Sequence, residues 1–435
     1  MGRFVVLVCA LAVATGVSCF FEPARPTGHG PGDAGIDAPA DVAPDADPCT
    51  RTCSGNDLSV VCPSGSSVTT CGWGCLGSAS GGGHCGRITP AGGAVSAADL
   101  DTTGLGSNIQ IDGVVDGDTG SIGTTRGEGS GVVSGIDYNL VGNVAVFRFG
   151  SVTITGTLSF AGSHPIAIVA QGPIVVSAPV DARGDCVGSD AGPGGSPGGG
   201  PNASASGSGA GAAGAGASCG GGGGGHGGHG GAGGKKNDTA AAGGVAFGDD
   251  IISVLAGGGG GGAGVGSEGG VGGGGGGALQ LVSSTSITVM AGAEINAGGC
   301  GGKPTTNSQP GGGGGAGGTI VLEAPVVTIN GAIGTNGGGG AGGDALGQPG
   351  QDGITDPVGA SGGTSGMSTQ AGGSGAAATF PDGVAAIGGA VSSGGGGGAV
   401  GRIRITTLSG TKNGSGTITP TLGATGCKAF TAVVQ

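Results

Sequence analysis

Residues 327–337 read Val327-Thr-Ile329-Asn-Gly331-Ala-Ile333-Gly-Thr-Asn-Gly337, and this stretch decides the fold. Its apolar residues alternate with small polar ones, which is the period of a β-strand with one buried face. The same pattern occurs at Val152-Thr-Ile154-Thr-Gly156-Thr-Leu158-Ser-Phe160-Ala-Gly162. Both stretches fit V-T-I-x-G-x-[LI]-x-x-x-G, so the chain repeats a short β unit.

A longer module contains this unit and occurs three times. Its first strand begins at Ile166, Leu279 and Ile320, and a fourth start lies at Ile403. A second and a third short apolar run follow each of the first three starts. Units this small cannot bury an apolar face alone, so they must stack. We therefore expect an all-β fold, a parallel β-solenoid-like stack of short strands over residues 88–435, with a β-sandwich as the alternative.

Glycine tracts separate these modules, at roughly 184–248, 257–277, 298–318 and 334–398, and 120 of the 435 residues are glycine. Each tract leaves the end of one β module and returns to the start of the next. The tracts could be flexible solvated loops. They could instead form a bundle of left-handed extended helices with three residues per turn, the polyproline II class. Collagen is excluded because the strict Gly-X-Y register is absent. We expect partial order, with all four tracts projecting from one region of the solenoid.

The N-terminus has the pattern of an export signal. Arg3 precedes the apolar stretch 4–14, which is too short to span a bilayer. Gly16-Val17-Ser18-Cys19 is similar to a bacterial lipobox, although Gly16 stands where an aliphatic residue is usual. We expect residues 1–19 to be a signal peptide and Cys19 to carry a lipid that anchors the protein in the membrane. Cleavage after Ala14, which would give a secreted protein, is the alternative.

A linker and a cysteine cluster follow. Residues 20–48 are rich in Asp, Pro and Ala, which makes a stiff and extended tether. Residues 49–87 contain six cysteines, Cys49, Cys53, Cys62, Cys71, Cys75 and Cys85. In an exported chain this density predicts a small module held by three disulfides, with fifteen possible pairings. Zinc is the weaker alternative, because Cys-x3-Cys pairs are less typical of zinc ligands. We expect the single tryptophan, Trp73, to cover a disulfide.

Four further cysteines, Cys186, Cys219, Cys300 and Cys427, predict two more disulfides. Cys186 and Cys300 stand just after the third strand of their modules. If these modules are neighbours, the strands lie ~4.8 Å apart, within the Cα separation of a disulfide. We favour Cys186–Cys300 with Cys219–Cys427. The alternative is Cys186–Cys219, which would close the base of the first glycine tract.

No catalytic residue, metal site or cofactor is predicted. His226-Gly-Gly-His229 has no cysteine or carboxylate beside it, so we expect both imidazoles to be solvated. Asp112, Asp116 and Asp118 do not match a calcium loop and are expected to be turn residues. Acidic residues outnumber basic ones by 27 to 14, which argues against nucleic acid as a partner.

The chain as a whole resembles the uncharacterised glycine-rich cell-surface lipoproteins of myxobacteria and their relatives. The features that carry the resemblance are the lipobox-like signal, the Asp/Pro/Ala linker, Cys71-Gly-Trp-Gly-Cys75, and glycine tracts that end in Gly-Gly-Thr-Ile-Val-Leu or Gly-Arg-Ile-Arg-Ile. The tracts are also similar to the polyglycine bundles of some phage adhesins and of an insect antifreeze protein.

This resemblance implies a location and a general class but no activity. Phe20 is not the acidic residue that retains many lipoproteins at the inner membrane, so we expect the outer membrane and the cell surface. We expect a structural or adhesive, non-enzymatic protein whose partners are the membrane, through the lipid, and a surface glycan or another cell-surface component. A glycan-active solenoid lyase or hydrolase is the alternative, and it would need carboxylates clustered on one face of the solenoid.

Overall fold

The computed structural model describes residues 49–77, 82–236, 239–266, 268–305, 307–366, 370–388 and 392–435. Cys49–Gln435 is one compact unit, so the predicted module 49–87 and the repeat domain 88–435 belong together. The predicted signal peptide, Cys19 and the linker lie outside the described residues.

The cysteine-rich module is a small antiparallel sheet held by three disulfides. Strands β1, β2 and β3 form the sheet, and β4 pairs with β5. The disulfides join Cys49 to Cys62, Cys53 to Cys75 and Cys71 to Cys85. Disulfide bonding is thereby confirmed for this cluster, and the zinc alternative is wrong. The strands are β1 (Thr50–Ser54), β2 (Asp57–Cys62), β3 (Gly65–Thr70), β4 (Cys75–Leu76) and β5 (His84–Cys85).

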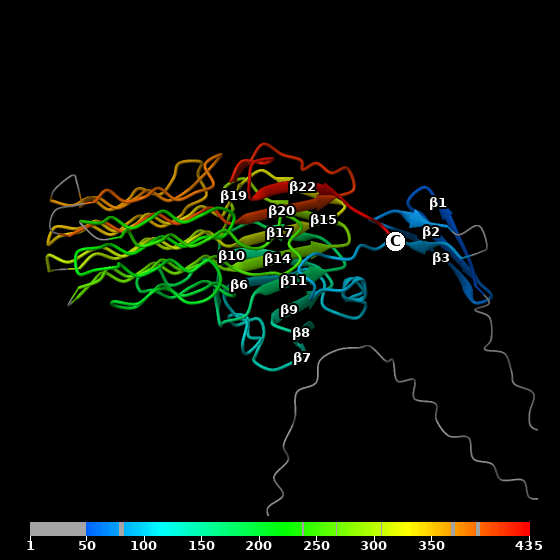
Figure 1. Ribbon diagram of the computed structural model, residues 1–435. Coiled ribbons are helices and arrows are strands. Elements are labelled where there is room, and N and C mark those ends of the chain that lie inside the picture. The colour runs from blue at the N-terminus through cyan, green and yellow to red at the C-terminus, as the bar shows by residue number, and fades with distance from the viewer. Residues whose placement is uncertain are drawn as a thin grey trace, which may run out of the picture. The chain divides into compact units, whose positions relative to one another are not determined.

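The rest of the unit is a stack of coils whose strands form two sheets (Figure 1). From β9 to β22 every neighbouring pair in the first sheet is parallel. The predicted all-β, parallel architecture is confirmed, whereas the strands of a sandwich would be antiparallel. The first sheet, in spatial order, consists of β22 (Cys427–Thr431), β20 (Arg402–Thr407), β17 (Thr319–Glu323), β14 (Ala278–Ser283), β11 (Ile166–Ala170), β9 (Val144–Phe149), β8 (Ile136–Val141) and β7 (Gly131–Val133).

The second sheet is centred on one long strand, β10. One half of β10 pairs with β12 and the other half with β13, so each later coil contributes two short strands in place of one long strand. The 3-10 helix η1 (Ala97–Leu100) precedes β6, which pairs with β10. The sheet contains β18 (Val326–Ile329), β15 (Ser286–Val289), β12 (Ile174–Val176), β10 (Val152–Ala161), β13 (Val180–Asp181), β16 (Glu294–Asn296), β19 (Ala332–Gly334), β21 (Thr417–Thr419) and β6 (Ile109–Asp116).

Equivalent apolar residues of successive coils lie in register and form the core. The predicted module starts pair as Ile166 with Leu279, Leu279 with Ile320, and Ile320 with Ile403. These four side chains are at most 2% exposed. Burying each large aliphatic side chain stabilises the fold by ~1.5–3 kcal/mol. The core is therefore a set of ladders that run along the stack.

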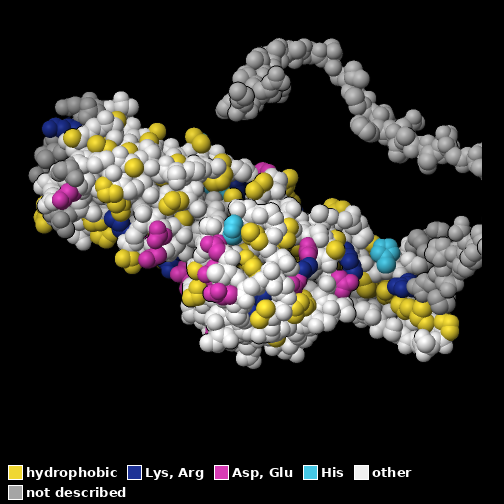
Figure 2. All heavy atoms as spheres, turned by 90° about the horizontal axis from the view of Figure 1, so that it is seen from below, with side chains coloured by type: hydrophobic (Ala, Val, Ile, Leu, Met, Phe, Trp, Pro, Cys, Tyr) yellow, Lys and Arg dark blue, Asp and Glu magenta, His cyan; other side chains and the backbone are white. Residues whose placement is uncertain are grey.

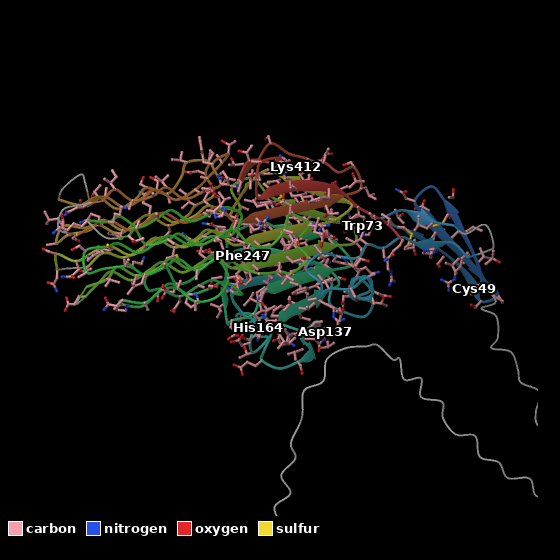
Figure 3. All side chains as sticks on the ribbon, viewed as in Figure 1. Cys49, Trp73, Asp137, His164, Phe247 and Lys412 are labelled. Carbon is pink, nitrogen blue, oxygen red and sulfur yellow. A yellow bond between two sulfur atoms is a disulfide. The ribbon has the colours of Figure 1, made fainter. Side chains whose placement is uncertain are left out.

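A second apolar cluster covers the outer face of the first sheet and joins it to the cysteine-rich module. Trp73 of the module, Val95 of the following segment and Val321 of β17 belong to this cluster. Trp73 therefore packs in the cluster on the sheet (Figure 3). Glu323 is buried there and accepts hydrogen bonds from the Ala91 amide at 3.0 and 3.2 Å and from Gln280 Nε2 at 2.9 Å. Burial raises the pKa of Glu323.

Candidate functional site: the polyglycine bundle

The glycine tracts form an ordered bundle attached to one side of the coils. The chain leaves the second sheet after β13, β16 and β19, and it returns to the first sheet at β14, β17 and β20. Between these points it passes back and forth in the extended segments seen beside the strands in Figure 1. The prediction that all tracts leave from one region is confirmed, and the described parts are more ordered than expected.

A three-residue hydrogen-bond period defines the bundle. Along Gly220–Gly225, the amides of Gly220 and Gly223 donate to Gly234 and Gly231. The next residue of each triplet donates to a second neighbour, Gly221 to Gly311 and Gly224 to Gly314. The third residue of each triplet donates to a third neighbouring pass, Gly222 to Ala212 and Gly225 to Gly209. One pass thus bonds to three others in rotation, as expected for helices with three residues per turn.

Close approach of backbones explains why these positions are glycine. A Cβ atom built on Gly223 would lie 1.9 Å from the carbonyl oxygen of Gly397, and one on Gly221 would lie 1.9 Å from that of Gly262. Neither glycine has a left-handed φ angle. The lattice therefore requires glycine for its lack of a side chain, while the conformation itself is open to other residues.

A disulfide ties the bundle together where it meets the sheets. Cys186 and Cys300 are joined, with a Cα–Cα distance of 5.1 Å, as the sequence predicted. The predicted partner bond was wrong, because Cys219 and Cys427 are buried thiols. Both lie within well-packed surroundings, and burial raises the pKa of Cys427 to about 12.

One group of possible metal-ligating side chains lies close together in the described parts of the chain, namely Cys186, Cys300 and Asp352. Both sulfur atoms of this group are already bonded to each other. Cys186 and Cys300 therefore act as a cross-link between two parts of the chain.

His226 joins parts of the bundle close to the parallel coils, and Arg402 of β20 links this point to the coils. The Nδ1 atom of His226 lies 2.8 Å from the carbonyl oxygen of Gly317, and its ring stacks on Phe247 at 4.6 Å between centroids. Arg402, at the start of β20, donates to the Phe247 carbonyl oxygen and pairs with Asp250 at 2.7 Å. Figure 3 shows Phe247 at the junction between the passes and the strands.

The expectation that both histidines are solvated was wrong for His226. Its side chain is 2% exposed, and burial lowers its pKa to about 4. His229, three residues later, is exposed. Sequence reasoning also missed Phe247, Arg402 and Asp250, since no local pattern links residues so far apart.

Polar residues gather at the turns where the passes reverse, away from the sheets. Hydrogen bonds connect several of these turns, from the Asp344 amide to the Gln309 carbonyl and the Ser392 hydroxyl, and from the Gly266 amide to Asn202 Oδ1. We call this set of residues the turn face. Its exposed polar members are Asn202, Lys235, Lys236, Glu268, Asn307 and Ser308, and the apolar Leu346 is exposed beside them.

Between the turns, the passes of the bundle carry exposed apolar side chains such as Val245, Val384 and Ile387. On the side seen in Figure 2, backbone and other uncharged atoms dominate, with hydrophobic groups scattered among them. Charged groups are few on this surface, in keeping with a chain in which 9% of residues are charged.

The aspartates considered for calcium serve the first coil. Asp116 Oδ1 accepts the amides of Asp118 and Thr119, at 2.8 and 3.1 Å. Asp118 Oδ1 accepts the Ser163 amide at 2.9 Å and lies 3.7 Å from His164 Nε2. Asp118 lies in the turn after β6, and Asp116 ends β6 with its side chain bonded to that turn, so the prediction holds for these two residues. It was wrong for Asp112, which lies within the strand β6.

Comparisons with protein-family models, with curated protein sequences and with solved structures find no match for this chain. Among the described residues, no helix has the length and apolar character needed to cross a membrane. Four disulfides indicate that the protein folds in an oxidising compartment.

Proposed function

We propose that this chain is an exported surface protein that presents the turn face for a structural or adhesive role, without catalysis. The observation that supports this proposal most is that backbone and side chains have separate roles in the bundle. Backbone hydrogen bonds hold the passes together, while exposed polar side chains such as Lys235 and Asn307 gather where the passes reverse. Such a lattice is a rigid support, and adhesion needs side chains held on a rigid support.

The anchor is part of the same proposal. A lipid on Cys19 would hold the protein in the outer membrane, and the linker 20–48 would space the folded unit from the bilayer. The composition of the linker supports this, because Pro stiffens a chain and like charges extend it. The resemblance to glycine-rich cell-surface lipoproteins gives the same location.

Several carboxylates of the coils are paired or covered, which supports a non-enzymatic role. Asp99 and Asp137 are held on either side of Arg148. Asp181 forms a hydrogen bond of 2.8 Å with Arg183. Glu323 is covered by the segment that contains Ala91. Glycosidases instead hold two carboxyl groups open to a sugar, roughly 5–9.5 Å apart.

The experiment compares adhesion by two sets of substitutions in the full chain, displayed on cells. The first set removes turn-face side chains, with Lys235→Ser, Lys236→Ser and Asn307→Ser. The matched set changes residues of the coils, the exposed Thr155→Ser and Thr157→Ser and the partly exposed Lys412→Ser. Attachment to a panel of surfaces and partner cells is measured by retention under flow.

The proposal predicts that the first set loses attachment and the matched set keeps it. Equal attachment by both sets would contradict an adhesive turn face. Incubation with a panel of polysaccharides tests the enzymatic alternative, and release of new reducing or unsaturated ends by the purified protein would overturn the non-enzymatic part.

A further inference from the structure

A cleft of about 1100 Å³ lies between the cysteine-rich module and one corner of the parallel coils. Arg51 and His84 line it from the module, and Gly172 and Ser284 line it from the turns that follow β11 and β14. Ligand sites typically enclose ~300–1,000 Å³. The cleft is therefore large enough for several linked units of an extended ligand.

The two walls are fixed relative to each other. Arg87 and Gln435 exchange backbone hydrogen bonds of 3.0 and 2.9 Å, which joins the end of the module to the last residues of the chain. Gly72 lies so close to the coils that a Cβ atom there would be 1.9 Å from the Ser284 carbonyl oxygen. The cleft is thus a preformed feature of one folded unit. Binding a ligand would therefore cost little free energy for ordering the walls of the cleft.

The charge of the cleft is opposite to that of the protein. The chain carries a formal net charge of −13, yet Arg51, Arg87 and His84 face the cleft and Asp101 is the acidic side chain in its lining. Arg87 and Asp101 lie 3.4 Å apart, and both side chains are nearly half exposed. An exposed pair of this kind contributes little, so Arg87 can exchange it for a ligand carboxylate.

The remaining lining is mixed, and its polar members suit the hydroxyl groups of a ligand. Thr103, Gln171, Ser284 and Thr285 offer donors and acceptors on the walls. The indole N–H of Trp73, which also lines the cleft, is buried and has no hydrogen-bond partner among the described residues. An unpaired buried donor costs free energy that an acceptor on a ligand can recover.

We propose that this cleft binds an acidic saccharide, with Arg51 and Arg87 holding its carboxylates and the hydroxyl and amide side chains holding its sugar hydroxyls. A guanidinium group presents a planar fork that matches a carboxylate. The site is separate from the turn face, and the inference stands without the adhesive proposal. The module that forms one wall is joined at Cys49 to the linker, so the ligand would be bound at the tethered end of the chain.

The test uses the fluorescence of Trp73, since the chain has one tryptophan. The full chain is titrated with a hexamer of galacturonic acid, with a neutral hexamer of galactose, and with an aspartate hexapeptide. Arg51→Gln and Arg87→Gln are compared with Lys235→Gln, a charge-matched control on the turn face. All three changed residues are exposed, so the variants should fold, and unchanged melting temperatures check this.

The acidic hexamer is expected to change the fluorescence with saturation and to bind at least tenfold more tightly than the neutral hexamer. Each arginine substitution should weaken binding about tenfold, because a hydrogen bond to a charged group is lost. Higher salt should weaken binding too, and Lys235→Gln should leave it unchanged. Absence of saturable binding, equal affinity for the neutral hexamer, or unchanged affinity in both arginine variants would overturn the proposal. Tighter binding of the aspartate peptide would overturn its assignment to saccharides.

Discussion

The α-carbon of Gly223 lies so close to Gly397 that a methyl group on it would stand 1.9 Å from the Gly397 carbonyl oxygen. The two residues belong to different passes of the bundle, and Gly223 is buried. Contacts of this kind recur throughout the tracts. The glycine content of the chain is therefore high because closely packed backbones leave no room for side chains.

The first prediction follows from that contact. Gly223→Ala should lower the free energy of unfolding by at least ~1–3 kcal/mol, the usual range for overpacking, because the obstructing atom is backbone and cannot turn away. Gly200→Ala is the matched control, since a Cβ at Gly200 would meet nothing within 4 Å. That change should be neutral or slightly stabilising through the unfolded chain. Thermal and denaturant unfolding of both variants gives the comparison, and equal stability would show that the lattice does not pack as described.

The second prediction concerns the cross-link between Cys186 and Cys300, whose sequence separation is 114. Replacing both by serine should destabilise the protein by ~2–4 kcal/mol, since a long loop is released in the unfolded state. Peptide mapping without reduction should recover the Cys186–Cys300 peptide and no peptide that joins Cys219 to Cys427. Recovery of Cys186 linked to Cys219 would contradict the structure.

The third prediction is a loss of stability in mild acid. Burial lowers the pKa of His226 from 6.5 to about 4, so between these values the unfolded chain binds a proton that the folded chain does not. The contribution of the neutral imidazole is complete above pH 6.5 and falls as the pH drops toward 4, by about 3 kcal/mol in total.

Two asparagine substitutions separate this effect from general acid sensitivity. His226→Asn should remove this part of the pH dependence, while His229→Asn, at an exposed site, should keep it. Melting temperatures measured from pH 7 to pH 4 report the difference. An identical pH profile in the wild-type protein and in His226→Asn would refute the assignment.

The fourth prediction concerns the anchor. If Cys19 carries a lipid, Cys19→Ala should move the protein from the membrane fraction into the soluble fraction after cell disruption. Mass spectrometry of the mature N-terminus should find a diacylated cysteine in the unchanged protein. Membrane association that persists in Cys19→Ala would count against lipidation.

The sequence predicted the coils well because their signal is local and repeated. Val152 and Val327 were matched by pattern alone, and the structure places both in one ladder, through Ile174 and Ile287. The pairing of Cys186 with Cys300 followed from the same alignment of modules. In a stacked repeat, equivalent positions become spatial neighbours, so a periodic sequence predicts contacts far apart in the chain.

The bundle was harder to predict because glycine carries little information about its neighbours. Nothing around Gly221 indicates that its amide donates to Gly311, or that His226 between glycines is enclosed. The pairing of Cys219 with Cys427 failed for a related reason. An even number of cysteines suggests that each has a partner, but it does not show that the two lie close together. Cys219 lies within the bundle, whereas Cys427 begins β22, a strand of the first sheet.

Amide hydrogen exchange of the tract glycines tests the central claim, that these tracts form a hydrogen-bonded lattice. In protein labelled with 15N at glycine, the amides of Gly220–Gly225 should exchange with solvent nearly as slowly as those of core strands such as β14, because each donates to a carbonyl on a neighbouring pass. Exchange of these glycines at the rates of an unstructured chain, while β14 stays protected, would contradict the account.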